Sequence, residues 1–253
     1  MTTKLNAVLA SIALAMTGTT AFAQRADKPS VVIVHGAFAD GSDWAKVIPL
    51  LQAKGINVVA VQNPLTSLED DVAATKRAID TQPGKVVLVG HSWGGVVITQ
   101  AGVDPKVSAL VYVAALVPDV GQAGGELGKA YPPASGFSHI SADGAGYLKM
   151  TQEGMAKHFA QDLPEKTTAV MTATQGPINS KAFAQKVTAA AWKTKPSWYI
   201  VSNQDRMIQP AQEEAMAKNI GAKVTTLQAS HVPQQSQPAK VAAVILDAVN
   251  NAK

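Results

Sequence analysis

The chain has 253 residues, of which 47% are hydrophobic and 16% charged, and it contains no cysteine. This composition supplies enough apolar side chains for one large folded domain and excludes a disordered or fibrous chain. It also excludes disulfides, thiolate metal sites and a cysteine nucleophile. The net charge of +4 comes without any cluster of Lys or Arg, so neither nucleic acid nor an anionic membrane is expected as a partner.

The first residues have the pattern of a signal peptide, predicted to span 1–23. Lys4 gives the opening segment a positive charge, residues 5–16 are almost entirely apolar, and Ala21 and Ala23 are small residues at the two positions that a signal peptidase reads. The apolar run is shorter than the roughly 20 residues needed to span a bilayer. The sequence therefore predicts cleavage after Ala23, export to the periplasm or the medium, and no stable membrane anchor afterwards.

Short apolar runs then alternate with helical patterns. The β-branched run at 30–34 is typical of a buried parallel strand, and the helix predicted over 43–54 is capped by Ser42 or Asp43 and closed by Gly55. This alternation predicts a parallel sheet with helices on both faces. Further strands are predicted at 57–61, 85–89 and 107–115, with helices from Ser67 or Leu68 to Asp80 and over 93–102.

Pro118 ends this alternation, and residues of about 119–194 have a different character. They are rich in Gly and Pro, carry helical patterns at 147–160 and 164–174, and show no strand pattern. We expect a helical lid over the edge of the sheet, inserted into a single domain of residues 24–253. The alternation then returns, with strands at 197–202 and 223–227 and helices at 210–219 and 238–249.

The sharpest local signal is the sequence Gly-His-Ser-Trp-Gly at 90–94. It matches the pattern G-x-S-x-G and lies directly between a predicted strand and a predicted helix. In this context the serine stands on a tight, strained turn with its hydroxyl above the sheet. Gly90 and Gly94 fit because a Cβ there would collide with neighbouring backbone. The sequence therefore predicts Ser92 as a nucleophile.

A serine hydroxyl needs a neighbouring base to take its proton, and the chain has five histidines. Only His231 follows the last predicted strand and precedes the last helix, at the carboxyl edge of the sheet where Ser92 also lies. Asp205, after the strand at 197–202, is at the same edge and would orient the imidazole. The alternative acid is Asp119, which follows the preceding strand.

Two backbone N–H groups, those of Phe38 and Trp93, are the predicted donors to an oxyanion, because the loop after the first strand and the helix after Ser92 begin at the same edge. His35 is expected to be a structural hydrogen-bonding residue of that loop. The side chains of Phe38 and Trp93 are expected to line the substrate pocket together with residues of the lid. The lid candidates, each with the alternative of lying in the lid's own core, are Phe137, Tyr147, Met150, His158 and Phe159.

Together these motifs resemble the α/β-hydrolase superfamily, and in particular the small-lid group of plant methylesterases, hydroxynitrile lyases and bacterial serine esterases. The resemblance implies the α/β-hydrolase fold and the chain order of nucleophile, acid and base that Ser92, Asp205 and His231 follow. The supporting segments are Val-His-Gly-Ala-Phe at 34–38, Val-Gly-His-Ser-Trp-Gly-Gly at 89–95, Ala-Ala-Leu-Val-Pro-Asp at 114–119 and Pro-Ser-Trp-Tyr-Ile-Val-Ser-Asn-Gln-Asp at 196–205.

Two positions separate this chain from the lyases of that group. The lyases resemble one another in a threonine and a lysine where this chain has Gly36 and Val232, so the ammonium that would stabilise a cyanide leaving group is missing. The sequence predicts a serine hydrolase that cleaves small carboxylic esters through an acyl-enzyme, with no metal or organic cofactor. The alternatives are a non-catalytic small-molecule-binding protein on the same scaffold, and lactonase, perhydrolase or lyase chemistry at the same residues. The sequence does not indicate an oligomeric state.

Overall fold

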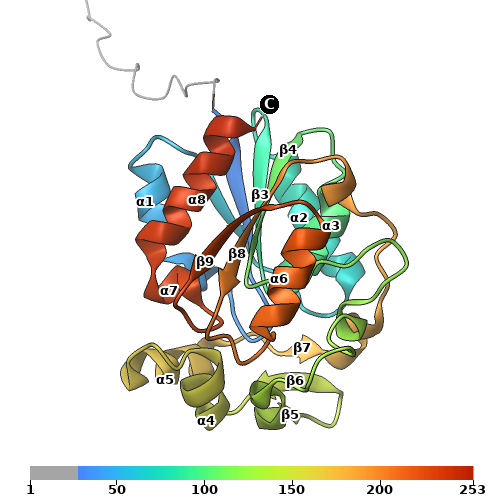
Figure 1. Cartoon of the computed structure of the whole chain (residues 1–253), viewed down its shortest axis with the longest axis vertical. Helices are drawn as coiled ribbons and strands as arrows, with labels where there is room; N and C mark the ends of the chain where they lie inside the picture. Colours follow the sequence, from blue (N-terminus) through green and yellow to red (C-terminus); the bar gives the residue numbers. More distant parts are fainter. Residues whose placement is uncertain (1–27, 253) are drawn as a thin grey trace, which may run out of the picture.

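A computed structural model of the chain describes residues 28–252 (Figure 1). The predicted signal peptide lies outside the described residues, so its cleavage and the export of the protein stay predictions. Within residues 28–252, no helix is both long enough and apolar enough to cross a membrane.

Six parallel strands form the centre of the molecule (Figure 1). They lie in the order β2-β1-β3-β4-β8-β9, and each neighbouring pair is parallel. The predicted parallel sheet is therefore confirmed. The strands are β1 (Ser30–Val34), β2 (Val58–Val61), β3 (Val86–His91), β4 (Val107–Val113), β8 (Ser197–Ser202) and β9 (Lys223–Leu227).

Helices cover both faces of this sheet (Figure 1). Because side chains alternate along a strand, Val31 and Ile33 of β1 point to the face covered by α1 and α8, whereas Val32 and Val34 point to the face covered by α2, α3 and α6. All four side chains are fully buried. The helices are α1 (Ile48–Gln52), α2 (Leu68–Asp80), α3 (Trp93–Ala101), α6 (Pro210–Asn219), α7 (Pro233–Ser236) and α8 (Pro238–Asn251).

The helix predicted over 43–54 is wrong in its extent. The structure instead has a 3-10 helix, Gly41–Trp44, followed by a turn and the short α1. The cap is also a different residue, because Asp40 accepts the N–H of Ser42 at 2.6 Å. Pro49 lies in the first turn of α1. Proline has no N–H to donate to the preceding turn, so it disfavours a continuous helix through this position and is better tolerated in a first turn.

The segment between β4 and β8 is not purely helical, which corrects the expectation of a lid without strands. Asp143 accepts the N–H groups of Ala145 and Tyr147, both at 2.9 Å, and so closes a hairpin where a helix from 147 was expected. The helix begins only at Gln152, after the cap Thr151. The lid elements are β5 (Ile140–Ala142), β6 (Tyr147–Met150), β7 (Ile178–Asn179), α4 (Gln152–Gly154), a π-helix (Met155–Phe159) and α5 (Glu165–Thr174).

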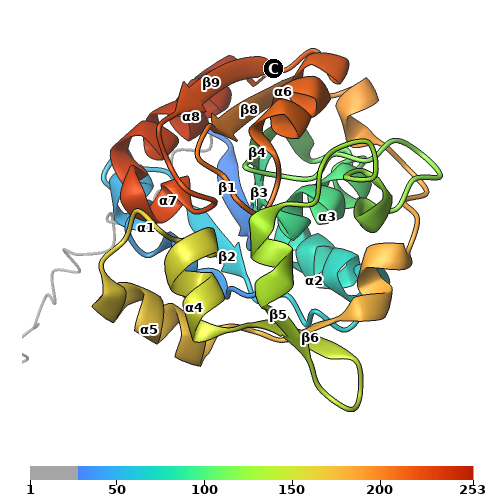
Figure 2. The ribbon, with the colours of Figure 1, turned by 60° about the horizontal axis from the view of Figure 1, so that its bottom comes forward.

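The order of the strands creates an opening at the carboxyl edge of the sheet. The chain passes from β1 to β2 on one side and returns to β3 on the other side of β1. The loops after β1 and β3 therefore leave in opposite directions, and open α/β sheets bind ligands at such a point. The lid elements lie across this edge (Figure 2).

We expect the free energy of unfolding to depend strongly on the buried valines of the sheet. Val111 of β4 is fully buried, whereas Val224 on the edge strand β9 is 47% exposed. Val111→Ala removes two buried methyl groups and leaves a cavity, so it should cost about 2 to 3 kcal/mol. The matched Val224→Ala should change the stability by less than about 0.5 kcal/mol. Urea denaturation followed by tryptophan fluorescence measures both, and equal costs would contradict the packing described here.

Candidate active site

Ser92 stands on the turn that joins β3 to α3. Its backbone has φ 52° and ψ −118°, which is a strained conformation for a residue with a side chain. A Cβ on Gly90 would lie 2.6 Å from the carbonyl oxygen of Gly94, and a Cβ on Gly94 would overlap the carbonyl oxygen of Val34 in β1. The two glycines therefore allow the close packing that holds Ser92 in this conformation.

The loop after β1 packs directly against the same turn. A Cβ on Gly36 would come to 2.8 Å from the Cβ of Ser92, so only glycine fits there. Phe38, two residues further on, also has a positive φ of 60°. Ser92 and the start of this loop are thus fixed against one another by backbone contact.

His35 holds that loop by hydrogen bonds. Its Nε2 accepts the N–H of Asn63 at 2.9 Å, so the proton of the ring is on Nδ1, which donates to the carbonyl oxygen of Gly36 at 2.8 Å. Burial lowers the pKa of His35, which keeps the ring neutral. Both ring nitrogens are occupied by backbone groups, as expected for a structural residue.

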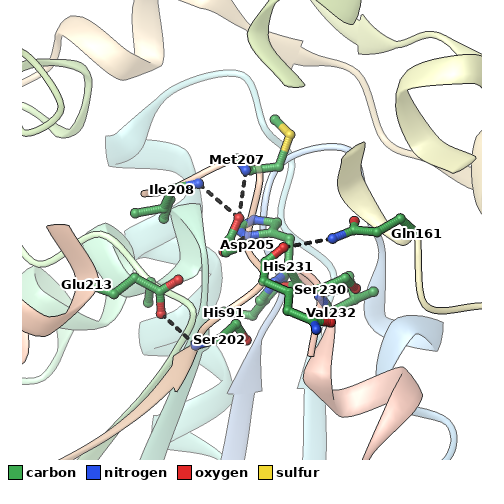
Figure 3. Close-up of polar contacts among 12 residues, drawn as sticks. His91, Gln161, Ser202, Asp205, Met207, Ile208, Glu213, Ser230, His231 and Val232 are labelled. Carbon is green, nitrogen blue, oxygen red and sulfur yellow. Dashed lines mark hydrogen bonds and ion pairs between the residues drawn. The ribbon is translucent and has the colours of Figure 1, made fainter. Parts of the chain in front are cut away.

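His231 and Asp205 form a buried hydrogen-bonded pair (Figure 3). Nδ1 of His231 donates to Oδ2 of Asp205 at 2.5 Å. The other oxygen of Asp205, Oδ1, accepts the N–H groups of Met207 at 2.6 Å and Ile208 at 2.9 Å. Three donors therefore fix the carboxyl group, and the imidazole keeps Nε2 for other partners. His231 and Ser92 line the same cavity.

His91 connects the two parts of the site. It follows Gly90 in β3, and its Nε2 donates to the carbonyl oxygen of His231 at 2.7 Å. The centroids of the two imidazole rings are 4.8 Å apart, and Phe159 packs on the ring of His231 at 4.9 Å. Burial, followed by the neighbouring ring of His231, lowers the pKa of His91 well below its ordinary value. A neutral histidine next to Ser92 in the sequence thus holds the backbone of residue 231.

The alternative acid, Asp119, lies elsewhere. It forms an exposed ion pair with Lys193, with Nζ and Oδ1 2.6 Å apart. The hydrogen bond from Lys193 lowers the pKa of Asp119. Of the two acids considered from the sequence, only Asp205 is hydrogen-bonded to His231.

Two backbone donors belong to residues of the same site: Trp93 follows Ser92 in the chain, and Phe38 lines the same cavity. In the part of the chain that the structure describes, the N–H of Phe38 and the N–H of Trp93 meet no acceptor. Trp93 is the first residue of α3, and the first N–H groups of a helix have no partner within the helix. Both groups are therefore available to a ligand, and the dipole of α3 favours negative charge at this end.

The side chain of Trp93 does not line the cavity, which corrects the expectation for its indole. It is fully buried, and its Nε1 donates to Oδ2 of Asp71 at 2.7 Å. The other oxygen of Asp71 accepts the N–H of Leu65 at 2.7 Å. Burial raises the pKa of Asp71 to about 6. Asp71 of α2 therefore connects the indole of the first residue of α3 to the backbone of Leu65.

A mostly apolar cavity of about 610 Å³ lies between the sheet edge and the lid. Of the side chains expected there, those of Phe38, Phe137 and Phe159 line it. Its volume is within the range of small-molecule sites. Among residues 28–252, no group of three or more His, Asp or Glu side chains is placed to hold a metal ion.

Three of the expected lid residues lie outside the cavity. Leu148 of β6 lines it, so its neighbour Tyr147 points to the opposite face of the strand. Met150 is buried and belongs to the main hydrophobic core. His158 stacks on His139, with ring centroids 4.3 Å apart. The strand β6, which the sequence did not reveal, explains the position of Tyr147.

Sequence reasoning also missed residues that line the cavity. Met207 and Ile208 lie two and three residues after Asp205, and Leu116 follows β4 at the same carboxyl edge. All three residues lie in loops that follow a strand, and the same signal indicated Phe38, so these residues could have been predicted from the sequence. Tyr131, Ile140 and Phe183 come from the lid, where no comparable signal exists.

The lid is tied to the loops that carry the acid and the histidine. Gln161 donates from Nε2 to the carbonyl oxygen of Gln204 at 2.7 Å, next to Asp205. Asp162 accepts the N–H of Ser230 at 2.9 Å, next to His231. Two consecutive lid residues thus hold both loops.

Comparisons with known proteins agree with this architecture. A sequence profile described as "Alpha/beta hydrolase family" matches residues 31–244. The chain is 27% identical to "Probable hydrolase R7" of Phoma sp. (strain ATCC 20986 / MF5453), over 87% of this chain and 98% of that protein. It is 25% identical to "Methylesterase 3" of Arabidopsis thaliana, over 88% of this chain and 97% of that protein.

A solved structure of polyneuridine aldehyde esterase has a similar fold. Its TM-score is 0.77 at 23% sequence identity, and the match covers 87% of this chain and 98% of that chain. The predicted α/β-hydrolase fold and the predicted resemblance to the group with plant methylesterases are confirmed.

Asp71 is expected to make the protein less stable as the pH rises from about 4 to about 6. Its pKa is about 6 in the folded protein against an ordinary 3.8, so over this window the folded state holds a proton that the unfolded state releases. The free energy of unfolding therefore falls with rising pH, by up to about 3 kcal/mol from this group. Urea denaturation at several pH values across this range measures how the free energy of unfolding changes with pH. In Asp71→Asn this free energy should not show the decrease that Asp71 contributes. The same pH dependence of the unfolding free energy in both proteins would contradict the raised pKa of Asp71.

Proposed function

The chain belongs to the alpha/beta hydrolase family, and we propose that it is a serine esterase that cleaves small carboxylic esters. The names of its relatives, among them a probable hydrolase and a methylesterase, support a hydrolase. One observation supports the finer assignment: His231, hydrogen-bonded to the buried Asp205, lines the same cavity as Ser92, which stands on a strained turn.

In the first half of the proposed reaction, the hydroxyl of Ser92 attacks the ester carbonyl while Nε2 of His231 takes its proton. The carbonyl oxygen becomes an oxyanion and accepts the N–H groups of Phe38 and Trp93. His231 then gives the proton to the alcohol oxygen as the carbon–oxygen bond breaks. The products of this half are the free alcohol and an acyl group bound to Ser92.

In the second half, His231 takes a proton from a water molecule, and the hydroxide attacks the acyl carbon. The bond to Ser92 breaks, and His231 returns the proton to the serine oxygen. Asp205 keeps the proton of His231 on Nδ1 and stabilises the imidazolium that forms twice in each cycle. Because both side chains are buried, this attraction is screened less than it would be in water.

The cavity supports an ester with an apolar acyl or alcohol part. Its walls include aromatic and aliphatic side chains from the sheet edge and from the lid, among them Phe38, Leu148, Phe159 and Met207. Apolar walls with a few polar groups near the reacting atoms are typical of small-molecule sites. Val232, the residue after His231, is fully buried and apolar, which disfavours the lyase alternative because no ammonium follows the histidine.

Ser92→Ala tests the proposed nucleophile. It should lower kcat on an activated ester by roughly 10⁴ to 10⁶, because the covalent intermediate can no longer form. It should also abolish labelling by a fluorophosphonate probe. Ser138→Ala in the lid, an exposed serine, is the control and should retain both. Near-normal turnover by the Ser92 variant would refute the mechanism, and folded wild type without labelling would favour a binding protein.

Leu148→Trp tests the assignment of the cavity to the substrate. The larger side chain should fill part of the cavity and lower kcat/KM for a bulky ester about tenfold or more, while an acetate ester is affected much less. Tyr147→Trp, on the opposite face of the same strand, is the matched control. A panel of esters with increasing acyl length measures the selectivity, and equal losses on all esters would show that this cavity does not hold the acyl or alcohol part.

A further inference from the structure

The proposed mechanism leaves a buried glutamate beside Asp205 without a role. Glu213 lies in α6, and its side chain is fully buried. One carboxyl oxygen, Oε2, accepts the N–H of Ser202 at 3.1 Å. The other oxygen, Oε1, accepts no hydrogen bond from any residue that the structure describes. An ionised carboxylate at this position would be poorly satisfied, because each of its oxygens can accept about two hydrogen bonds.

The carboxyl group of Glu213 is a hydrogen-bonding neighbour of that of Asp205. Figure 3 draws both side chains, with the hydrogen bond from Ser202 to Glu213 as a dashed line. Two carboxyl groups can form a hydrogen bond only if one of them holds a proton, since an ionised carboxylate can only accept. Asp205 already accepts three donors, from His231, Met207 and Ile208, whereas Glu213 accepts one. The negative charge of Asp205 is therefore better stabilised by hydrogen bonds than that of Glu213 would be. The proton between the two carboxyl groups belongs to Glu213.

The charges around Glu213 favour the same state. The titratable groups that act on it are Asp205, the neighbouring Glu214 and the phenol of Tyr199, and none of them is a cation. Within residues 28–252, Glu213 takes part in no ion pair. Burial, followed by the charge of Asp205, raises the pKa of Glu213 well above its ordinary value. Two adjacent buried negative charges are thereby avoided.

We propose that Glu213 is a positioning residue that stays a neutral carboxylic acid in the working enzyme and donates a hydrogen bond to Asp205. Glu213 does not line the cavity, so it acts on catalysis through Asp205 and not on the substrate. The fourth donor fixes the carboxylate toward His231 and occupies one of its lone pairs, so the proton between Asp205 and His231 stays on Nδ1. This inference rests on the proposed function, because it assigns Glu213 to the acid of the same catalytic site.

Substitutions of Glu213 separate a neutral donor from an ionised group. In Glu213→Gln the amide carbonyl can accept from Ser202 and the amide N–H can donate to Asp205, so kcat should stay within about threefold and the acidic limb of the kcat/KM profile should not move. Glu213→Leu removes the donor. We expect kcat to fall roughly 10- to 100-fold with little change in KM, and the acidic limb to shift to higher pH, because Asp205 then attracts the imidazolium more strongly.

Two results would overturn the proposal. If Glu213 were ionised, Glu213→Gln would remove a negative charge near His231 and shift the acidic limb to lower pH. If Glu213 had no positioning role, Glu213→Leu would turn over like the wild type. The same substitutions at the exposed neighbour Glu214 control for charge and helix propensity. Circular dichroism and a thermal melt check that each variant is folded.

An infrared measurement tests the proton on Glu213 without using activity. The difference spectrum between wild type and Glu213→Gln at neutral pH should contain the C=O stretching band of a protonated carboxylic acid, shifted in heavy water. Absence of this band would overturn the proposal even for an active esterase, and even if Glu213→Leu failed to fold. If the wild type cleaved no ester, the proposed function would fail, while the band would still report the protonation state.

Discussion

At the carboxyl edge between β1 and β3, two stretches of backbone approach so closely that no side chain fits between them. Gly94 lies against the carbonyl oxygen of Val34, and Gly36 lies against Ser92. This approach places the start of the loop after β1 beside the serine, and it leaves the N–H groups of Phe38 and Trp93 without partners in the described residues. It also places His91 where its ring can bind the backbone of His231. The arrangement of the whole site follows from this contact.

The electrostatic design of the site complements this geometry. Burial keeps His35 and His91 neutral, and both rings serve backbone groups. Among the three histidines near the serine, only His231 has a carboxylate partner. Nδ1 of His91 has no partner among the described residues, but His91 lacks a carboxylate that would stabilise its protonated form. In the proposed mechanism the base is therefore His231.

The sheet and the residues at its edge could be predicted from the sequence because each depends on a local signal. Buried parallel strands have short β-branched runs, so the strands at 197–202 and 223–227 have the expected bounds, and position after a strand indicated Asp205 and His231. The lid could not be predicted in this way. Its hairpin depends on one turn at Asp143, and the side chains that face the cavity depend on the alternation of a four-residue strand, β6.

The role of Glu213 shows a different limit. Glu213 and Glu214 are consecutive in a helix with weak amphipathic character, and nothing in the local sequence distinguishes the buried one. Only the packing of α6 beside the loop of Asp205 decides which of the two meets a second carboxyl group.

The hydrogen bonds of Gln161 and Asp162 bear on how this scaffold could be re-engineered. Because these two residues hold the loops of Asp205 and His231, the lid is not an interchangeable module, and a graft from another protein would have to keep both anchors. The tip of the hairpin differs, since Gly144 has open space around it. Extra residues or a fused peptide inserted at this tip would leave the anchors untouched, which makes the tip the natural place to diversify a library of variants.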